Sequence, residues 1–317
     1  MKKALLTVAI AGTTLLTPAP KLEAQTFEPS GVYLYAEKGG EELFLSVYDP
    51  APESQATLEG KTKPTVIFLF GGGFMEGTRD NEFYHPWYRK LTENGYRVVS
   101  VDYRLGLKGV TKLGVFQNRI LEDAIRLAVD DLFSATAFLL DNAGSLGIDP
   151  GNIVVSGSSA GAITSLHADW ELSNRTPATH VLPESFRYAG VMAFSGAIFS
   201  RRGLPAYRRG AAPTLFFHGT ADKLVPYKQI HFMRLHFAGS DKLCSLFRKQ
   251  GYNYCIYRFL GNTHEIAASM EMNFDREIEF LENNVMRGEK RIVDQTIDDP
   301  TIEKPDWATK TSKDIYK

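Results

Sequence analysis

The chain has 317 residues, of which 44% are hydrophobic, 23% charged and 12% aromatic. This is the composition of a globular protein, so collagenous, coiled-coil and wholly disordered classes are excluded. The 36 Lys and Arg residues and 37 Asp and Glu residues give a formal net charge of -1, which excludes the strong positive field expected of a nucleic-acid-binding protein. Two cysteines are too few for a disulfide framework or a four-cysteine zinc site.

Residues 1–24 have the order of a secretory signal peptide. Lys2 and Lys3 form a basic start, and the apolar residues 4–16 that follow are fewer than the roughly 20 that a membrane-spanning helix needs. Cleavage is expected after Ala24. We therefore expect a secreted or periplasmic protein with no stable membrane insertion once the signal is removed, the alternative being an N-terminal membrane anchor.

The two cysteines leave two alternatives open. Ten residues separate Cys244 from Cys255, across a predicted turn at Gly251 between a helix and a strand. In an oxidising compartment they could form a disulfide. Two buried free thiols are the other reading.

Apolar strands and amphipathic helices alternate along residues 27–286, and no linker interrupts them. Strands are expected at residues 32–35, 43–48, 65–70, 96–101, 153–155, 190–194, 214–217 and 254–260, and helices at 83–94, 119–142 and 265–284. The alternation predicts one α/β domain with a mostly parallel central sheet, helices on both faces and an antiparallel N-terminal edge. Residues 287–317 are polar and charge-mixed, and are expected to form a loosely held charged tail.

Residues 157–161 read Gly-Ser-Ser-Ala-Gly and match the G-x-S-x-G pattern of a nucleophile turn. The motif follows a predicted strand and precedes a predicted helix, which is the context that the pattern requires. Its small residues let the backbone reverse sharply and leave the hydroxyl of Ser159 in the open, while the helix amides point at a developing oxyanion. We predict that Ser159 is a nucleophile; helix capping is the alternative role of Ser158 and Ser159.

Three glycines, residues 71–73, follow the predicted strand at 65–70. Consecutive glycines cost conformational entropy and contribute no packing, so they are expected where backbone amides must approach a ligand closely. The amides of Gly72 and Gly73, with that of Ala160, are predicted to form an oxyanion hole. A simple turn is the alternative.

Two further polar residues follow later strands at the same edge of the sheet. Asp222 comes after the strand at 214–217, and His264 after the strand at 254–260. A serine hydroxyl needs a histidine to take its proton, and the histidine needs a carboxylate to orient it. The chain order Ser159, Asp222, His264 therefore predicts a catalytic triad.

Three neighbouring residues compete for these roles. His218 is an alternative base, and Glu265 and Asp241 are alternative acids. No histidine or cysteine cluster has metal-ligand spacing, and residues 71–73 lack the G-x-G-x-x-G spacing of a nucleotide-binding loop. We expect neither a metal nor a cofactor.

Taken in order, these motifs resemble those of α/β-hydrolase-fold serine carboxylesterases. The chain is most similar to the branch shared by hormone-sensitive-lipase-like esterases and bacterial feruloyl and acetyl-xylan esterases, over residues 60–285. The matching segments are residues 71–74 with Gly77, 102–105 (Asp-Tyr-Arg-Leu), 146–150 (Leu-Gly-Ile-Asp-Pro), 157–161 and 218–222. The resemblance implies the α/β-hydrolase fold, with Gly72, Gly73 and Ala160 as the oxyanion hole.

The chain departs from the family at Phe70, where the usual H-G-G-G motif has a histidine that steadies the oxyanion loop. Residues 106–118 and an insertion at 172–187 are expected to shape the mouth of the pocket. Candidate pocket-lining residues are Phe74, Met75, Phe116 and Phe199.

The resemblance implies a serine ester hydrolase that acts through an acyl-enzyme on a small-molecule or polysaccharide ester. Export and the resemblance together favour removal of acetyl or feruloyl groups from plant polysaccharide. A serine peptidase of the prolyl-oligopeptidase type is an alternative, but about 40 residues ahead of the glycines cannot hold its propeller. A lipase, for which no broad apolar lid is identified, and a non-enzymatic binding protein on the same fold are the others.

Overall fold

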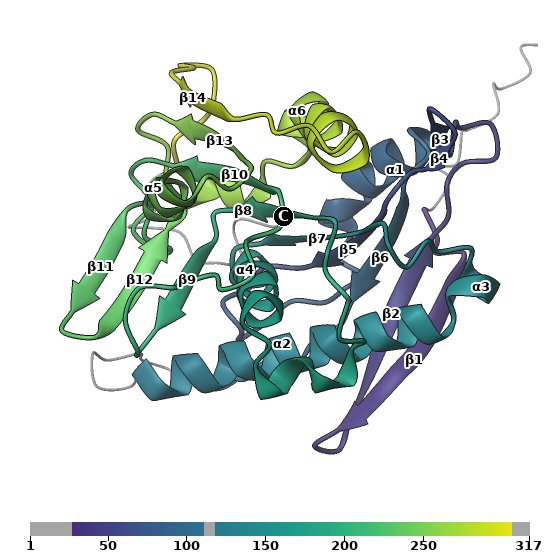
Figure 1. Cartoon of the computed structure of the whole chain (residues 1–317), viewed down its shortest axis with the longest axis horizontal. Helices are drawn as coiled ribbons and strands as arrows, with labels where there is room; N and C mark the ends of the chain where they lie inside the picture. The colour runs from purple at the N-terminus through teal and green to yellow at the C-terminus, as the bar shows by residue number, and fades with distance from the viewer. Residues whose placement is uncertain (1–26, 111–117, 306–317) are drawn as a thin grey trace, which may run out of the picture.

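The computed structural model describes residues 27–110 and 118–305, so the predicted signal peptide and Phe116 lie outside the described residues. Its main sheet has the strand order β1-β2-β6-β5-β7-β8-β10-β13-β14 (Figure 1). The strands are β1 (Gly31–Lys38), β2 (Glu41–Tyr48), β5 (Thr65–Leu69), β6 (Arg97–Val101), β7 (Ile153–Ser158), β8 (Gly190–Phe194), β10 (Thr214–Gly219), β13 (Tyr254–Phe259) and β14 (Val293–Ile297). β2 pairs antiparallel with both β1 and β6, and the other pairs are parallel. This confirms the predicted fold class and its antiparallel N-terminal edge.

Helices cover both faces of the sheet (Figure 1). On one face lie α1 (His85–Glu93), preceded by the 3-10 turn η1 (Glu82–Tyr84), and α6 (Phe274–Phe280). On the other lie α2 (Asn118–Asp141) and α4 (Ala160–Asn174), and the short α3 (Ala143–Leu146) follows α2. α5 (Ser240–Gln250) ends at Gly251, whose φ of 70° forms the predicted turn into β13.

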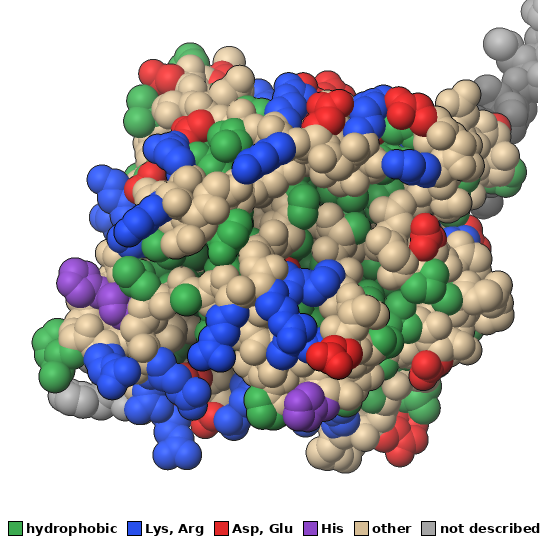
Figure 2. All heavy atoms as spheres, in the orientation of Figure 1, with side chains coloured by type: hydrophobic (Ala, Val, Ile, Leu, Met, Phe, Trp, Pro, Cys, Tyr) green, Lys and Arg blue, Asp and Glu red, His purple; other side chains and the backbone are tan. Residues whose placement is uncertain are grey.

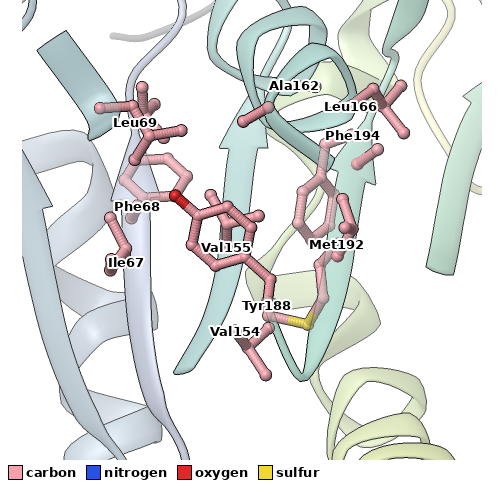
Figure 3. Packing of buried hydrophobic residues seen from close by; sticks show 14 of the residues in the cluster. Ile67, Phe68, Leu69, Val154, Val155, Ala162, Leu166, Tyr188, Met192 and Phe194 are labelled. Atoms are coloured by element: carbon pink, nitrogen blue, oxygen red, sulfur yellow. The ribbon is translucent and has the colours of Figure 1, made fainter. Parts of the chain in front are cut away.

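The central strands are buried on both faces, which is why they read as continuous apolar runs. Figure 3 shows Val155 of β7 between Phe68 of β5 and Met192 of β8, with Ala162 and Leu166 of α4 nearby. The core thus holds β7 rigidly, together with the turn at its end.

The expected boundary at residue 286 is wrong, because β14 adds a strand to the sheet after it. Val293 pairs with Cys255 and Ile297 with Phe259. Asp294 also forms ion pairs with Arg248 and Arg258. As an edge strand with exposed polar residues, β14 has no hydrophobic pattern by which the sequence would reveal it.

The single helix expected at 265–284 is also wrong. The segment consists of the 3-10 helices η4 (His264–Ala268) and η5 (Glu271–Asn273), then α6, then a π-helical turn, η6 (Leu281–Met286). The Ser269 hydroxyl donates to the Ile266 carbonyl, and the Asn273 amide group donates to the Ser269 carbonyl. Such side-chain bonds to the backbone compete with a regular helix.

The insertion expected over the active edge, residues 172–187, lies at the opposite edge. α4 starts at the carboxyl edge and runs back along the sheet for 15 residues, or about 22 Å. The 3-10 helix η3 (Pro177–Val181) therefore lies near the edge at which β8 begins.

A second sheet, which no sequence pattern predicts, has the order β11-β12-β9. It consists of β9 (Ala197–Ser200), β11 (Gln229–Phe232) and β12 (Leu235–Gly239). A two-stranded ribbon, β3 (Thr57–Leu58) and β4 (Lys61–Thr62), precedes β5. Cys244 and Cys255 are both buried free thiols, which decides between the two alternatives for them. In the described ranges no helix has both the length and the apolar character to cross a bilayer.

Candidate active site

Ser159 occupies a strained turn between β7 and α4, with φ 51° and ψ -112°. A Cβ on Gly161 would lie 2.0 Å from the Leu69 carbonyl oxygen, and one on Gly157 would lie 2.2 Å from the carbonyl carbon of Gly161. Only glycine therefore fits on either side of the turn. The Ser159 amide donates to the Phe194 carbonyl at 2.9 Å, which ties the turn to β8.

The structure brings Ser159, His264 and Asp222 together in one hydrogen-bonded row. Ser159 Oγ lies 2.8 Å from His264 Nε2, and His264 Nδ1 lies 2.7 Å from Asp222 Oδ2. All three residues are buried. They come from the ends of β7, β13 and β10, and they meet because parallel strands end at one edge of the sheet.

Asp222 is held as an anion. Its Oδ1 accepts hydrogen bonds from the amides of Leu224 at 2.9 Å and Val225 at 3.0 Å. Burial alone would raise the pKa of Asp222, but the imidazoles of His264 and His218 outweigh burial and hold that pKa well below its usual range. The carboxylate can therefore orient His264 and stabilise its imidazolium form.

The three competing residues have partners outside the row, and His218 also contacts Asp222, with its Nε2 3.3 Å from Asp222 Oδ2. His218 Nδ1 lies 2.7 Å from Ser240 Oγ, and its Nε2 lies 3.2 Å from the Val225 carbonyl oxygen. Glu265 accepts from the Thr263 amide at 2.8 Å, and Asp241 accepts from the Tyr227 hydroxyl at 3.1 Å. The carboxylate in contact with His264 Nδ1 is that of Asp222.

The glycine loop has positive φ values, 126° at Gly72 and 65° at Gly73, in the region that favours glycine. The amides of Met75 and Glu76 both donate to the Gly72 carbonyl, so the loop folds back on itself. A Cβ on Gly72 would lie 1.9 Å from the Glu76 carbonyl oxygen. Ala160 is the first residue of α4, where helix amides have no partner within the helix.

Two tyrosines that the sequence analysis does not single out hold this loop. The Gly71 amide donates to the Tyr84 hydroxyl at 3.1 Å, and the Tyr103 hydroxyl donates to the Phe70 carbonyl at 2.8 Å. The Phe70 ring stacks on Tyr103 with centroids 4.4 Å apart. These contacts supply the support expected of the missing histidine, and the one available sequence signal is that Tyr103 lies in the Asp-Tyr-Arg-Leu segment.

A cavity of about 500 Å³ lies between α1 and the 3-10 helices that follow His264. Its lining is mostly aromatic and thioether: Phe83, Tyr84, Trp87, Lys90, Ala268, Met270, Glu271 and Met272. Tyr84 joins the cavity to the glycine loop, and Ala268 ends the helix that starts at His264. None of Phe74, Met75 and Phe199 lines this cavity: Phe74 and Phe199 are buried in the core, and Met75 is exposed.

Within the described ranges, no group of three or more His, Cys, Asp or Glu side chains is placed to hold a metal ion. The groups that the site brings together are a hydroxyl, an imidazole and a carboxylate, with the backbone amides of the glycine loop in the same region. This set of groups at the carboxyl edge of a doubly covered sheet is the arrangement found in serine hydrolases of the α/β-hydrolase fold.

Comparison with known families agrees with this class. Residues 54–196 match the model of BD-FAE, a family of bifunctional feruloyl and acetyl xylan esterases. The match includes the glycine loop and Ser159, while Asp222 and His264 lie beyond it.

Curated relatives match a similar share of the chain. Esterase B1 of Culex pipiens is 27% identical over 45% of this chain and 30% of its own length. Lipase 2 of Moraxella sp. (strain TA144) is 28% identical over 45% of this chain and 32% of its own length. The chain thus spans about a third of the length of these relatives.

Solved structures match most of the chain. A thermophilic esterase of Thermogutta terrifontis superposes with a TM-score of 0.56 at 22% identity, covering 80% of this chain and 94% of the other. Its propionate-bound form superposes with a TM-score of 0.54 at 23% identity, covering 79% and 94%. These matches show that the chain has the fold of these esterases.

Proposed function

We propose that the protein is an exported serine esterase that removes acetyl or feruloyl groups from plant polysaccharide. The observation that carries the proposal is the row Ser159 Oγ–His264 Nε2–Asp222 Oδ2, with contacts of 2.8 and 2.7 Å, beside a glycine loop built for close backbone approach. The activity needs no cofactor, because the residues of the site supply every proton transfer and charge.

In the first half-reaction, Ser159 Oγ bonds to the ester carbonyl carbon while its proton passes to His264 Nε2. The carbonyl oxygen becomes an oxyanion, and the amides of Gly72, Gly73 and Ala160 stabilise it. The tetrahedral intermediate then collapses, breaking the bond to the alcohol oxygen, which takes the proton from His264. The products are the free alcohol and an acyl group on Ser159.

In the second half-reaction, water gives a proton to His264 Nε2 and its oxygen bonds to the acyl carbon. The second intermediate breaks the bond to Ser159 Oγ, which recovers the proton, and the acid leaves. Asp222 keeps its charge throughout and stabilises the imidazolium that forms twice in the cycle.

Three observations support the choice of acyl group. The BD-FAE family acts on feruloyl and acetyl esters. The Thermogutta terrifontis esterase has been solved with propionate and with butyrate bound, which are short acyl products. The cavity lined by Tyr84, whose hydroxyl accepts from the Gly71 amide of the glycine loop, has an aromatic lining and the size for a phenyl-bearing group.

Side-by-side hydrolysis of acetylated xylan and a feruloylated arabinoxylan fragment tests the proposal, with Ser159→Ala as the blank. We expect acetate or ferulate to be released by the native enzyme and not by the variant, and the ratio of the two names the preferred acyl group. Activity on simple aryl esters with release of neither acid from polysaccharide would remove the polysaccharide assignment.

A further inference from the structure

β11 and β12 form an arm, residues 229–239, that projects from the body at the left of Figure 1. β12 pairs with β9, so the arm is fixed to the body on one side, while β11 is an edge strand. The arm is distinct from the triad and has no role in the mechanism above.

The base of the arm is built into the surroundings of the catalytic acid. Ser240, which follows β12, contacts His218 Nδ1 at 2.7 Å, and His218 Nε2 lies 3.3 Å from Asp222 Oδ2. The loop from Asp222 leads directly into β11. A polymer held on the arm would therefore be held beside the site.

Cations outnumber acidic residues in this segment. Residues 197–239 contain seven Lys or Arg residues and one acidic residue, Asp222, and only Arg201 and Arg209 of the seven form ion pairs, with Glu122 and Glu184, within the described residues. Lys223, Lys228 and Arg234 are exposed, and no ion pair to them occurs within the described residues. Figure 2 shows Lys and Arg side chains gathered on this side of the molecule. Such a region attracts an anionic ligand.

The arm also exposes apolar side chains. Ile230 is 56% exposed, Phe232 70% and Met233 81%. In the register of the hairpin, Ile230 pairs with Phe237 and Phe232 with Leu235, so one face of the arm is apolar. Contiguous exposed apolar residues are typical of a binding surface.

The charge decides which occupant fits. Pairing of two copies through β11 would bring Lys228 and Arg234 of each copy against those of the other, which like charges oppose. A polysaccharide with uronic-acid carboxylates offers anions for the cations and the apolar faces of sugar rings for Phe232. We propose that the arm binds an acidic polysaccharide, the polymer that carries the ester in the function proposed above, on which this inference rests.

Binding is tested with Ser159→Ala, which cannot turn over its ligand, by affinity electrophoresis in gels that contain glucuronoxylan or the same polymer after reduction of its carboxyl groups. We expect the gel with the acidic polymer to retain the protein. This retention should be lost in the gel with the carboxyl-reduced polymer and at high salt. The double change Lys228→Gln/Arg234→Gln should weaken retention about tenfold, because it removes two exposed charge contacts.

A matched control removes the same charge away from the arm, with Lys249→Gln/Lys290→Gln, both of them exposed. We expect this control to be retained like Ser159→Ala alone. When Ser159 is intact, both double variants are expected to keep the native kcat/KM on 4-nitrophenyl acetate. Equal retention by the acidic and the reduced polymers, or equal loss in the two double variants, would overturn the inference.

Two further outcomes are informative. Sedimentation with vesicles of phosphatidylglycerol and phosphatidylcholine, without retention by glucuronoxylan, would assign the arm to lipid and overturn the inference. Because retention is measured without hydrolysis, an enzyme that releases no acid from any polymer but is retained by the acidic one would remove the proposed function and support the arm as a binding surface.

Discussion

His218 Nε2 lies 3.3 Å from Asp222 Oδ2, the same oxygen that His264 Nδ1 contacts at 2.7 Å. One carboxylate therefore lies between two imidazoles, of which only that of His264 contacts Ser159 in the hydrogen-bonded row. We infer that His218 is a positioning residue that holds Asp222 and the loop after it, and that His264 is the base.

The two histidines are separated by substitution. His218→Gln should lower kcat on 4-nitrophenyl acetate about tenfold with little change in KM, since it loosens Asp222 without removing the base. His264→Gln should lower kcat at least about 10³-fold. If His218→Gln is the more damaging change while both variants remain folded, the assignment of the base is wrong.

The strain at Ser159 predicts a stability difference between two inactive variants. Ser159→Gly and Ser159→Ala both remove the nucleophile and should lower kcat about 10⁶-fold. Glycine accepts φ 51° and ψ -112° at no steric cost, so Ser159→Gly should exceed Ser159→Ala by about 1 kcal/mol in free energy of unfolding. Urea denaturation measures the difference, and equal stabilities would argue against strain in the turn.

The glycine after the nucleophile turn is a steric requirement of the fold. Gly161→Ala places its Cβ 2.0 Å from the Leu69 carbonyl oxygen and should cost about 3 kcal/mol or more in free energy of unfolding. Gly144→Ala is the matched control, because no atom lies within 4 Å of its added Cβ and α3 is helical there. That change should be neutral or stabilising by less than about 1 kcal/mol. Thermal unfolding of both variants decides the point.

Asp169 makes stability depend on pH. Burial raises its pKa to about 6, although Arg187 at 3.8 Å and the Ala212 amide oppose the shift. Below its unfolded pKa of about 3.9 the group is protonated in both states and costs nothing. As pH rises from about 4 to 6 the unfolded chain ionises first, so the folded state loses about 3 kcal/mol relative to the unfolded one.

Asp169→Asn should remove that loss. We expect the free energy of unfolding of the variant, relative to that of the native protein, to be higher at pH 7 than at pH 4.5. Urea denaturation at the two pH values measures this difference. The exposed Asp149→Asn serves as the control and should show no such gain. A parallel pH dependence in the native protein and Asp169→Asn would contradict the raised pKa.

The sequence by itself determined the α/β class and the three residues of the triad row. Each of these residues follows a strongly apolar strand, and such a strand is recognised from its own composition. Because the strands are parallel, the residues that follow them meet at one edge of the sheet. The glycine loop is recognisable for the same reason, since consecutive glycines are informative without knowledge of their neighbours.

Only the tertiary structure decided features that depend on contacts between distant segments. Tyr84 supports the glycine loop from η1 and Tyr103 supports it from the segment after β6, and no local pattern marks them for that role. β14 joins the sheet through backbone hydrogen bonds, while its side chains are mostly polar. The segment 172–187 lies at the edge opposite to the predicted one because its position depends on the length and direction of α4. Backbone pairing and helix direction leave little trace in side-chain chemistry, whereas burial of an apolar strand leaves a clear one.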